Sequence, residues 1–552
     1  MRNKRIYLIF FLLGIAVALP FVFPALGFFS YVTLVPVILL VTRECPEMSK
    51  KGAYLVGLCF GMGYFGVMFH WFTEFYPMEF AGITKGTAFC LVAVCWIGLA
   101  LVQALEFGAV TLAYRLIRVR STRPVIGGML FIALWVIFEW QQTFFWRGVP
   151  WARLAITQTN VLPALQSASV FGGLFVSGLI VSVNALLASA VGVAIDRLDS
   201  ENSGEKAFSR ITGAIKNKKT VILALVALGI YLLNIGFGAV RMMTYNEEKG
   251  TPVKAAVIQG NISSLDKWGT SAIKSLNIYL DLTEKCVRET GAELVVWPET
   301  VIPSNISLYP NVMTRIAQKA DELDITLFVG AFDKALKANE DGEREEYNAI
   351  YLFHPDGKIS DQRYYKQRLV PFGEYTPMED IIFTVLPVLD TFNLFNDPLS
   401  PGKGTQLFDT AHGKIGSLIC FDSIYDYLSS EAVADGAELI TLSTNDSWFT
   451  DSPAVWQHNS HARLRAIESG RYIVRAASTG VSSILTPTGA IIAEIEPLTE
   501  GYAEATVYTK DSRTVYSYIG NIAVYICIGY TASVISFKVT RYLKNKKTVT
   551  ED

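Results

Sequence analysis

The 552-residue chain is too long for one ordinary domain, and its content of 51% hydrophobic and only 18% charged residues is typical of a membrane protein. The formal net charge of −2 argues against a nucleic-acid-binding protein. The seven cysteines include no CxxC pair, so neither a disulfide framework nor a zinc site is expected.

The long apolar runs are confined to the N-terminal part of the chain and one C-terminal stretch. Because roughly 20 apolar residues cross a bilayer, residues 1–242 are predicted to form a membrane domain of about seven transmembrane helices. We predict a soluble domain over 252–512, a further transmembrane helix over 515–537 and a tail over 538–552. No small-residue cleavage site follows the first apolar run, so that run is expected to be retained. The eight predicted spans are 6–22, 24–42, 53–73, 86–112, 124–144, 162–194, 220–240 and 515–537.

Basic residues are abundant in every second loop. With a cytoplasmic N-terminus, the inside segments hold 21 lysines and arginines, and the short outside loops hold only Lys85, Arg147 and Arg153. The positive-inside rule then favours an even number of spans with both termini in the cytoplasm. It places residues 252–512 on the extracytoplasmic (periplasmic) side of a multi-pass protein of the inner, or cytoplasmic, cell membrane. The alternative, an odd number of spans with this domain in the cytoplasm, would put the basic tail outside.

Two further stretches each allow two interpretations. The predicted outer loop from Trp146 to Arg153 is either an interfacial aromatic belt or a contact for a lipid phosphate, which arginine suits. The stretch from Thr376 to Pro398 is rich in large apolar residues but interrupted by Pro387. It is either a buried lid or an arm that enters the outer leaflet, and we favour the arm.

Strand-like and helix-like segments alternate through residues 252–512. The expected strands are 254–260, 294–297, 325–332, 349–353, 407–408, 415–419, 439–444 and 472–476, with a hairpin over 482–495. The expected helices are 271–289, 311–322 and 454–469. Such alternation predicts an α/β sandwich.

Three strand-like runs lead to residues with chemistry to offer. Apolar runs precede Glu299 and Cys420, and Tyr364-Tyr365 precedes Lys366. Because open α/β sheets place their chemistry at the carboxyl ends of strands, we expect these residues to form one site. A cysteine nucleophile needs a base, which Glu299 can supply if burial raises its pKa. Lys366 can stabilise an oxyanion and favour the thiolate.

The five histidines give no recognisable triad context. His458 and His461 have the spacing of a metal-binding pair on one helix, but no third ligand is evident, so we interpret both as polar helix residues. No metal and no cofactor are predicted.

The set of Glu299, Lys366 and Cys420 resembles the Glu-Lys-Cys triad of the nitrilase, or carbon–nitrogen hydrolase, superfamily. A narrower resemblance, to the bacterial apolipoprotein N-acyltransferase family, rests on motifs and on the eight-span frame, and covers essentially the whole chain. The motifs are Val257-Ile-Gln-Gly-Asn261 with Trp268, Val296-Trp-Pro-Glu299, Lys366-x-x-Leu-Val-Pro-Phe-Gly-Glu374-Tyr, Ile419-Cys420, Asn445-Asp-Ser-Trp448-Phe and Trp456-Gln-His458. The resemblance implies a multi-span α-helical membrane domain joined to an extracytoplasmic nitrilase-like αββα sandwich.

The resemblance also implies a role for each matching residue. Cys420 would be the nucleophile, Glu299 the general base and Lys366 the oxyanion stabiliser. Glu374 matches a second glutamate that supports the site, and Trp268 matches a tryptophan near the lipid entrance.

Four more positions are expected to support the site or to bind substrate. Asn445 and Trp448 lie in a matching motif. Where the family commonly has Cys-Tyr-Glu, this chain has Cys420-Phe421-Asp422. Phe421 lacks the hydroxyl and Asp422 has a shorter reach, which leaves the finer roles of these two residues open.

The implied reaction is acyl transfer in two steps. Cys420 attacks an acyl ester of a phospholipid, which releases a lysophospholipid and leaves a thioester. The α-amine of a diacylglyceryl-cysteine lipoprotein then attacks the thioester to give an amide, which completes lipoprotein maturation. The implied partners are a phospholipid donor, a diacylglyceryl apolipoprotein acceptor and the membrane, and the enzyme is expected to be a monomer.

Three other functions remain open at this point. A membrane-anchored nitrilase-type amidase would use the same triad with water as the acceptor. A pseudoenzyme or lipid-binding receptor would leave Cys420 inert. A transporter is least favoured, because the predicted spans contain few ionisable residues, chiefly Glu106 and Glu139.

Overall fold

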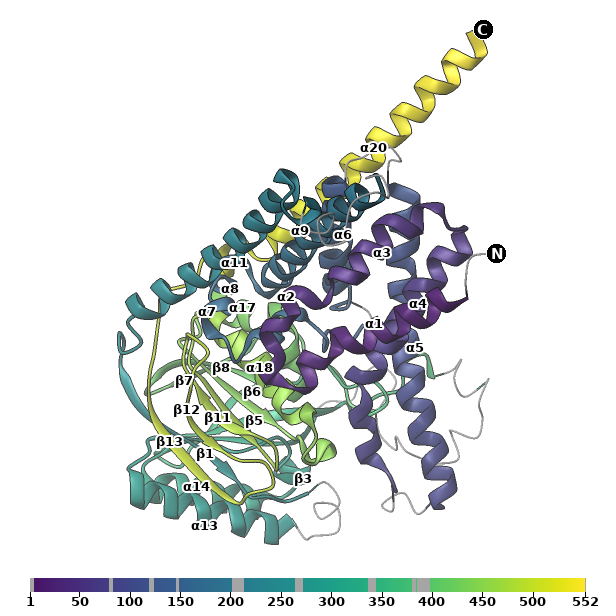
Figure 1. Ribbon diagram of the computed structural model, residues 1–552. Coiled ribbons are helices and arrows are strands. Elements are labelled where there is room, and N and C mark those ends of the chain that lie inside the picture. Colours follow the sequence, from purple (N-terminus) through teal and green to yellow (C-terminus); the bar gives the residue numbers. More distant parts are fainter. Residues whose placement is uncertain are drawn as a thin grey trace. The chain divides into compact units, whose positions relative to one another are not determined.

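The computed structural model describes residues 4–78, 83–118, 124–144, 148–200, 213–263, 272–335, 344–379, 384 and 398–551. The chain separates into two compact units (Figure 1). Unit 1 comprises Met1–His70, Ala93–Met243 and Asn521–Asp552, and unit 2 comprises Trp71–Val92 and Thr244–Gly520.

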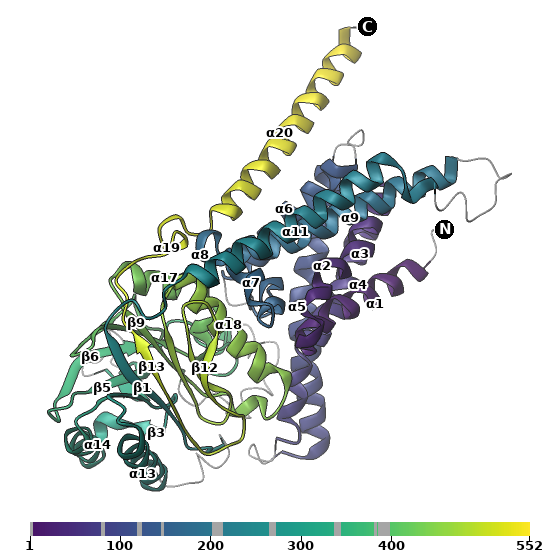
Figure 2. The same cartoon turned by 60° about the vertical axis from the view of Figure 1, so that its left-hand side comes forward.

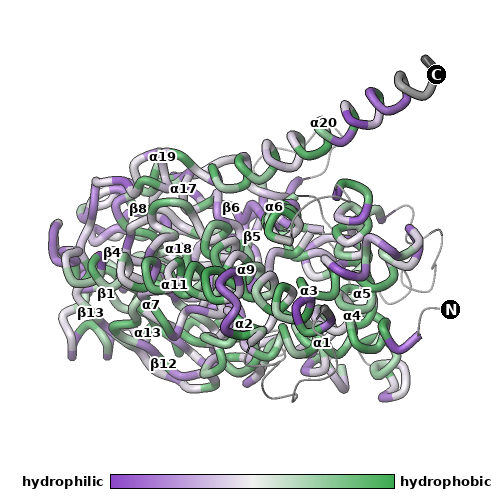
Figure 3. Tube along the Cα trace, turned by 45° about the horizontal axis from the view of Figure 1, so that its top comes forward, coloured by the Kyte–Doolittle hydropathy of each residue, from purple (hydrophilic) through white to green (hydrophobic). Residues whose placement is uncertain are grey.

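Helices make up the regular structure of unit 1. They are α1 (Arg5–Val22), η1 (Pro24–Phe29), α2 (Ser30–Thr33), α3 (Val35–Glu44), η2 (Cys45–Glu47), α4 (Lys50–Met68), α5 (Lys85–Ile117, which begins in unit 2), α6 (Pro124–Gln141), η5 (Leu154–Gln158), α7 (Leu162–Leu165), α8 (Ala168–Phe171), α9 (Gly173–Ser200), α11 (Lys218–Thr244) and α20 (Ile522–Glu551). Figure 3 shows hydrophobic colouring along α9 and α11 and hydrophilic colouring towards the end of α20.

Six helical segments of the described chain are long and apolar enough to cross a membrane. They are Arg5–Val22, Pro24–Glu47, Lys85–Ile117, Gly173–Asp199, Lys218–Thr244 and Ile522–Lys546. The multi-span helical domain expected from the sequence is therefore confirmed. The remaining two predicted spans coincide with α4 and α6, which are not among the six, so the count of eight stays a prediction.

Small residues bring the helices of unit 1 into close contact. A Cβ atom at Gly14 of α1 would lie 2.1 Å from the carbonyl oxygen of Phe60, and one at Gly63 of α4 would lie 2.1 Å from that of Phe11. Only glycine therefore allows these two backbones to approach so closely. Such packing is how apolar helices associate where no water is present to drive them together.

The predicted outer loop is more buried than either interpretation of it required. Trp151 and Arg153 are exposed by only 1% and 0%. These two side chains thus form neither an interfacial belt nor an open phosphate contact. Trp146 and Arg147 lie outside the described residues, as do 380–383 and 385–397 of the predicted membrane arm.

Two β-sheets form the centre of unit 2. The first has the strand order β13-β1-β2-β4-β5-β6 with β3 paired to β4, and the second has the order β12-β11-β10-β9-β8-β7. The neighbours β1, β2 and β4 run parallel, as do β8, β9 and β10. The strands are β1 (Pro252–Gln259), β2 (Leu294–Val296), β3 (Ile302–Asn305), β4 (Thr326–Lys334), β5 (Glu346–Phe353), β6 (Ile359–Tyr365), β7 (Leu407–Thr410), β8 (Gly413–Ile419), β9 (Leu439–Thr444), β10 (Ile473–Ala477), β11 (Ser482–Leu485), β12 (Ile491–Ile495) and β13 (Gly501–Tyr508).

Apolar side chains of the two sheets meet in one core, to which β1 contributes Val257 and β8 contributes Ile419. A second core on the outer face of the first sheet includes Leu276 and Ile316 from two covering helices. Figures 1 and 2 show these helices, α13 and α14, side by side. The longer helices of unit 2 are α13 (Ala272–Thr290), α14 (Pro310–Leu323), α17 (Asp426–Ala434) and α18 (Pro453–Ser469).

On the second sheet, α17 packs against β8, and α18 packs against β10 and β11. The order of layers is thus helix, sheet, sheet, helix, and the expected αββα sandwich is confirmed. Every strand and helix expected between 254 and 495 is present, within a few residues at its ends. The elements β3, α17 and β13 were not predicted, and β13 pairs with β1 along its whole length.

Candidate active site

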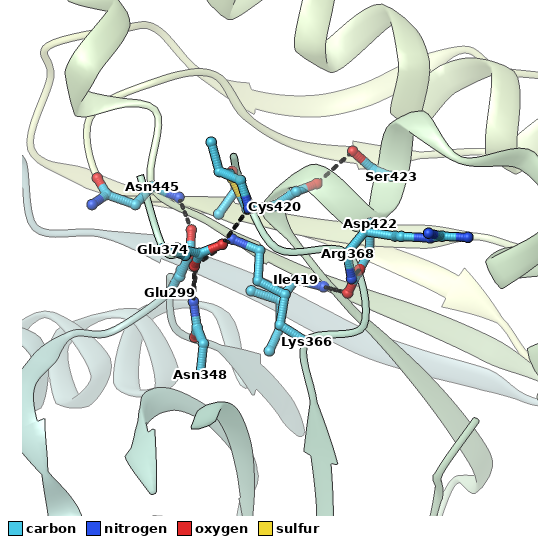
Figure 4. A network of polar contacts seen from close by, with 12 residues as sticks. Glu299, Asn348, Lys366, Arg368, Glu374, Ile419, Cys420, Asp422, Ser423 and Asn445 are labelled. Carbon is cyan, nitrogen blue, oxygen red and sulfur yellow. Dashed lines mark hydrogen bonds and ion pairs between the residues drawn. The ribbon is translucent and has the colours of Figure 1, made fainter. Parts of the chain in front are cut away.

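Three strand ends deliver the predicted triad to one place in unit 2. Glu299 follows β2, Lys366 follows β6 directly, and Cys420 follows β8 directly. The hydroxyl of Ser443 on β9 donates to the carbonyl of Trp297 at 2.8 Å, which joins the two sheets beside the site. Figure 4 shows Glu299, Lys366, Glu374 and Cys420 grouped together.

Lys366 lies between two carboxylates. Its Nζ donates to Oε1 of Glu299 at 3.0 Å and to Oε1 of Glu374 at 2.8 Å. The lysine side chain is only 1% exposed, and the side chains of Glu299 and Glu374 are 6% and 13% exposed. Although burial lowers the pKa of the Lys366 amine, the two carboxylates raise it well above its usual range. Lys366 is therefore held as an ammonium ion.

Each carboxylate has further donors that fix its orientation (Figure 4). Glu299 accepts from Nδ2 of Asn348 at 2.6 Å and from the backbone N–H of Asn445 at 2.7 Å. Glu374 accepts from the same Asn348 amide at 3.1 Å and from the backbone N–H of Val370 at 2.8 Å. Asn348 on β5 thus bridges both glutamates and is itself only 2% exposed. It was not predicted from the sequence.

The Cys420 backbone turns sharply at the end of β8. Its φ of 47° lies in the left-handed region that non-glycine residues avoid. Its carbonyl accepts a hydrogen bond from the Ser423 hydroxyl at 2.8 Å. Burial raises the pKa of the Cys420 thiol, Glu299 adds to this effect, and Lys366 opposes it. The thiol is therefore protonated at neutral pH until a base accepts the proton.

Asp422 is an internal anchor of this turn. Its carboxylate accepts from the Tyr364 hydroxyl at 2.8 Å, from the Arg368 N–H at 2.8 Å and from the Ile419 N–H at 3.1 Å. These bonds join the end of β8 to the segment that follows Lys366. Burial raises the pKa of Asp422 to about 6, against the opposing effect of Lys366.

The other two motif residues with described structure lie around this centre. The Phe421 ring packs edge-on against Tyr425, with centroids 5.9 Å apart. Trp448 stacks on Phe75 at 5.7 Å, and Phe75 belongs to the segment η3 (His70–Phe75). Trp268 lies outside the described residues.

His458 lies beside the Cys420 turn, a position that its spacing in the sequence did not indicate. Nδ1 of His458 lies 2.8 Å from Oδ1 of Asp446, and its Nε2 lies 3.1 Å from the carbonyl oxygen of Cys420. The pair could not be predicted from spacing, because Asp446 follows β9 and His458 lies on α18. Only the folded chain brings them beside the cysteine.

Cys420, Asp446 and His458 also offer potential metal-ligand atoms within 4.8 Å of one another. However, Arg475 Nη2 donates to the second oxygen of Asp446 at 2.7 Å. Although burial raises the pKa of the Asp446 carboxyl, Arg475 and His458 hold it well below its usual range. The carboxylate is thus already paired with cationic and imidazole groups, an arrangement that suits charge pairing better than cation binding.

Known families match both parts of the chain. Residues 13–186 match the family described as apolipoprotein N-acyltransferase N-terminal domain, and residues 254–516 match carbon-nitrogen hydrolase. The apolipoprotein N-acyltransferase of Geobacter metallireducens is 31% identical over 542 residues, with 98% of this chain and 96% of the relative covered. The enzyme of the same name from Pseudomonas aeruginosa is 27% identical, with 85% of this chain and 84% of the relative covered.

Solved structures match about half of the chain. A nitrilase-superfamily protein of Saccharomyces cerevisiae is 20% identical with a TM-score of 0.36, and covers 50% of this chain and 95% of its own. A carbon-nitrogen hydrolase of Helicobacter pylori is 17% identical with a TM-score of 0.37, and covers 49% of this chain and 94% of its own.

Proposed function

The chain belongs to the apolipoprotein N-acyltransferase family, and from this premise we propose the reaction that its site performs. A fatty acyl chain passes from a phospholipid to Cys420 as a thioester, and then to the N-terminal amine of a diacylglyceryl-cysteine lipoprotein. We thus propose the phospholipid donor, the thioester on Cys420 and the role of each residue for a member of a lipoprotein-acylating membrane enzyme family.

The observation that best supports this chemistry is the buried network around Lys366. A single ammonium ion bonds both Glu299 and Glu374 beside Cys420, the residue that directly follows β8. A buried cation of this kind is suited to a reaction in which negative charge develops on an acyl oxygen. Two of its three N–H donors are directed at carboxylates, and the third is available for the oxyanion.

Glu299 is the base in both proposed steps. Its carboxylate accepts the thiol proton as the Cys420 sulfur attacks the ester carbonyl. The tetrahedral intermediate collapses when the C–O bond to glycerol breaks, and Glu299 returns the proton to that oxygen. In the second step the lipoprotein amine attacks the thioester, the C–S bond breaks, and Glu299 transfers the amine proton to the departing thiolate.

The supporting residues hold this arrangement rather than react. Asn348 and the Asn445 backbone orient Glu299, while Glu374 orients Lys366. Asp422 fixes the turn that carries the cysteine. No nucleotide is required, because conversion of a thioester into an amide is downhill.

We propose that both lipid substrates reach the site from the outer leaflet. The enzyme would be a monomer of the inner membrane with unit 2 on the extracytoplasmic side. A catalytic unit tethered to the membrane holds its site at a high effective concentration of membrane-bound substrates.

Intact-protein mass spectrometry after incubation with phospholipid tests the first step. Wild type should gain one fatty-acyl mass that neutral hydroxylamine removes, and Cys420→Ala should gain none. An equal adduct on Cys420→Ala contradicts the assignment of the nucleophile. A wild type that forms no adduct, even when trapped within one turnover, favours a membrane-anchored amidase with a small substrate.

A further inference from the structure

His458 lies next to the backbone of Cys420 and has no role in the proposed reaction steps. The imidazole is 1% exposed, and it lies between Asp446, which is 0% exposed, and the Cys420 turn. One ring nitrogen of His458, a carboxylate oxygen of Asp446 and the Cys420 sulfur lie within 4.8 Å of one another. Its charge therefore bears directly on the sulfur.

The hydrogen bonds of Asp446 indicate that Nδ1 of His458 carries a proton. Arg475 Nη2 donates to Oδ2 of Asp446 at 2.7 Å, which keeps the carboxylate ionised and able only to accept. Nδ1 lies 2.8 Å from Oδ1 of that carboxylate and must donate to it. Nη2 of Arg475 also lies 3.4 Å from Nδ1, which is farther than the 2.8 Å to Asp446. The positive charge of Arg475 disfavours a protonated His458, but this contact does not replace the hydrogen bond to Asp446.

The neighbouring hydrogen-bond acceptors indicate that Nε2 also carries a proton. It lies 3.1 Å from the carbonyl oxygen of Cys420, which can only accept. The Ser423 hydroxyl lies 3.0 Å from Nε2 and donates its one proton to the same carbonyl at 2.8 Å. If Nε2 instead accepted a proton from Ser423, its lone pair would face the Cys420 carbonyl oxygen. With protons on both nitrogens, the contacts of the ring with Asp446, Ser423 and the Cys420 carbonyl are all attractive.

A cation at His458 would add positive charge beside the Cys420 sulfur, where Lys366 supplies little. The one ammonium of Lys366 is shared between two carboxylates, so little positive charge is left for a thiolate. Arg475, Asp446 and a protonated His458 together carry a net positive charge. The charged and titratable groups that face the His458 ring include Asp446, Arg475 and Cys420.

We propose that His458, oriented by Asp446, is a positioning residue for Cys420. Its imidazolium holds the Cys420 carbonyl in the left-handed turn and supplies a second positive charge beside the sulfur. The left-handed conformation is unfavourable for a non-glycine residue, and the two hydrogen bonds to the carbonyl offset that strain. The inference rests on the proposed function only in taking Cys420 as the nucleophile.

The test is the pH dependence of Cys420 alkylation by iodoacetamide in the full-length protein, followed by peptide mass mapping. His458→Gln keeps an N–H donor near the Cys420 carbonyl but cannot be a cation. We expect it to raise the pH midpoint of alkylation by about one unit and to slow alkylation at pH 7 about tenfold. His461→Gln, a buried histidine one turn further along α18, is the matched control and should leave the midpoint unchanged.

A wild-type midpoint in folded His458→Gln overturns the proposal, because a merely structural side chain would not move the titration of the thiol. A thermal melt of each variant establishes folding, and His458→Asn repeats the comparison if His458→Gln is unfolded. Ser423→Ala removes an uncharged donor from the same carbonyl and should keep the wild-type midpoint. Alkylation needs no lipid, so a wild type that forms no acyl adduct contradicts the proposed function without affecting this comparison.

Discussion

Asn348 shows how one uncharged side chain stabilises a site with an excess of negative charge. Glu299 and Glu374 place two carboxylates around the single ammonium of Lys366. The Asn348 amide donates to both carboxylates, at 2.6 Å and 3.1 Å, and adds no charge of its own. It therefore relieves the repulsion between the glutamates without adding a second cation.

Replacement of Asn348 by leucine should slow thioester formation. Loss of hydrogen bonds to a charged group costs about 1.5–3 kcal/mol, which corresponds to roughly 10- to 100-fold in rate. Single-turnover acylation followed by mass spectrometry measures the rate. Asn277→Leu on the exposed face of α13 is the control and should react as wild type. An unchanged rate in Asn348→Leu would show that the two glutamates need no such bridge.

At the residue scale, the sequence revealed the side chains that follow apolar strands. Glu299, Lys366 and Cys420 could be singled out because each comes at or just beyond the end of a strand-like run. Asn348 could not, because it lies inside β5 and acts through partners on other elements. His458 was interpreted as a polar helix residue because no third metal ligand was evident, and its neighbour Asp446 lies on a different element that only tertiary structure brings beside it.

At the scale of elements, the Glu299 segment owes its position to close packing against β4. A Cβ atom on Gly330 of β4 would lie 2.3 Å from the carbonyl oxygen of Pro298 and 2.7 Å from the Cα of Glu299. These atoms are backbone, so they cannot rotate away. The absence of a side chain at Gly330 is what lets the segment that carries Glu299 pack so closely against the strand.

Gly330→Ala should therefore displace Glu299 and destabilise unit 2. Overpacking of this kind costs typically about 1–3 kcal/mol, and thioester formation should fall with the displacement. Gly501→Ala on β13 is the control, because no atom lies within 4 Å of its added Cβ. Thermal melts and acylation rates of the two variants make the comparison. Equal melting temperatures and rates would mean that the Glu299 segment can shift without cost.

Elements with strong apolar patterns were predictable, and those without them were not. The strands β8 and β9 are almost wholly buried and stand out as apolar runs. The strand β13 is partly exposed along most of its length, so its residues show no clear alternation. The nine-residue segment Asp426–Ala434 mixes polar and apolar residues without a clear pattern, and its helix α17 packs on β8, a contact that only the folded chain shows.

At the scale of the whole molecule, charge asymmetry predicts the side of the membrane on which catalysis occurs. The basic loops that we assign to the cytoplasm include the tail carried by α20. The membrane potential and anionic lipids retain such segments inside. Unit 2 would then face the compartment in which lipoproteins expose their amines.

Membrane-impermeant maleimide labelling of spheroplasts tests this orientation. A cysteine at exposed Ser307 of unit 2 should be labelled in intact spheroplasts, and one at exposed Lys544 on α20 only after permeabilisation. Peptide mapping separates these sites from the native cysteines. Labelling of Lys544→Cys alone in intact spheroplasts would reverse the assignment and place catalysis in the cytoplasm.

The central claim, transfer of the acyl group to an amine and not to water, is tested by one single-turnover measurement. Acyl-enzyme formed from phospholipid is separated from free lipid and mixed with a diacylglyceryl-cysteine peptide. Mass spectrometry should show loss of the acyl mass from the protein and an N-acylated peptide in equal amount. The same peptide with a blocked amine should leave the acyl-enzyme intact. Release of free fatty acid at the same rate with both peptides would contradict the account and identify a hydrolase.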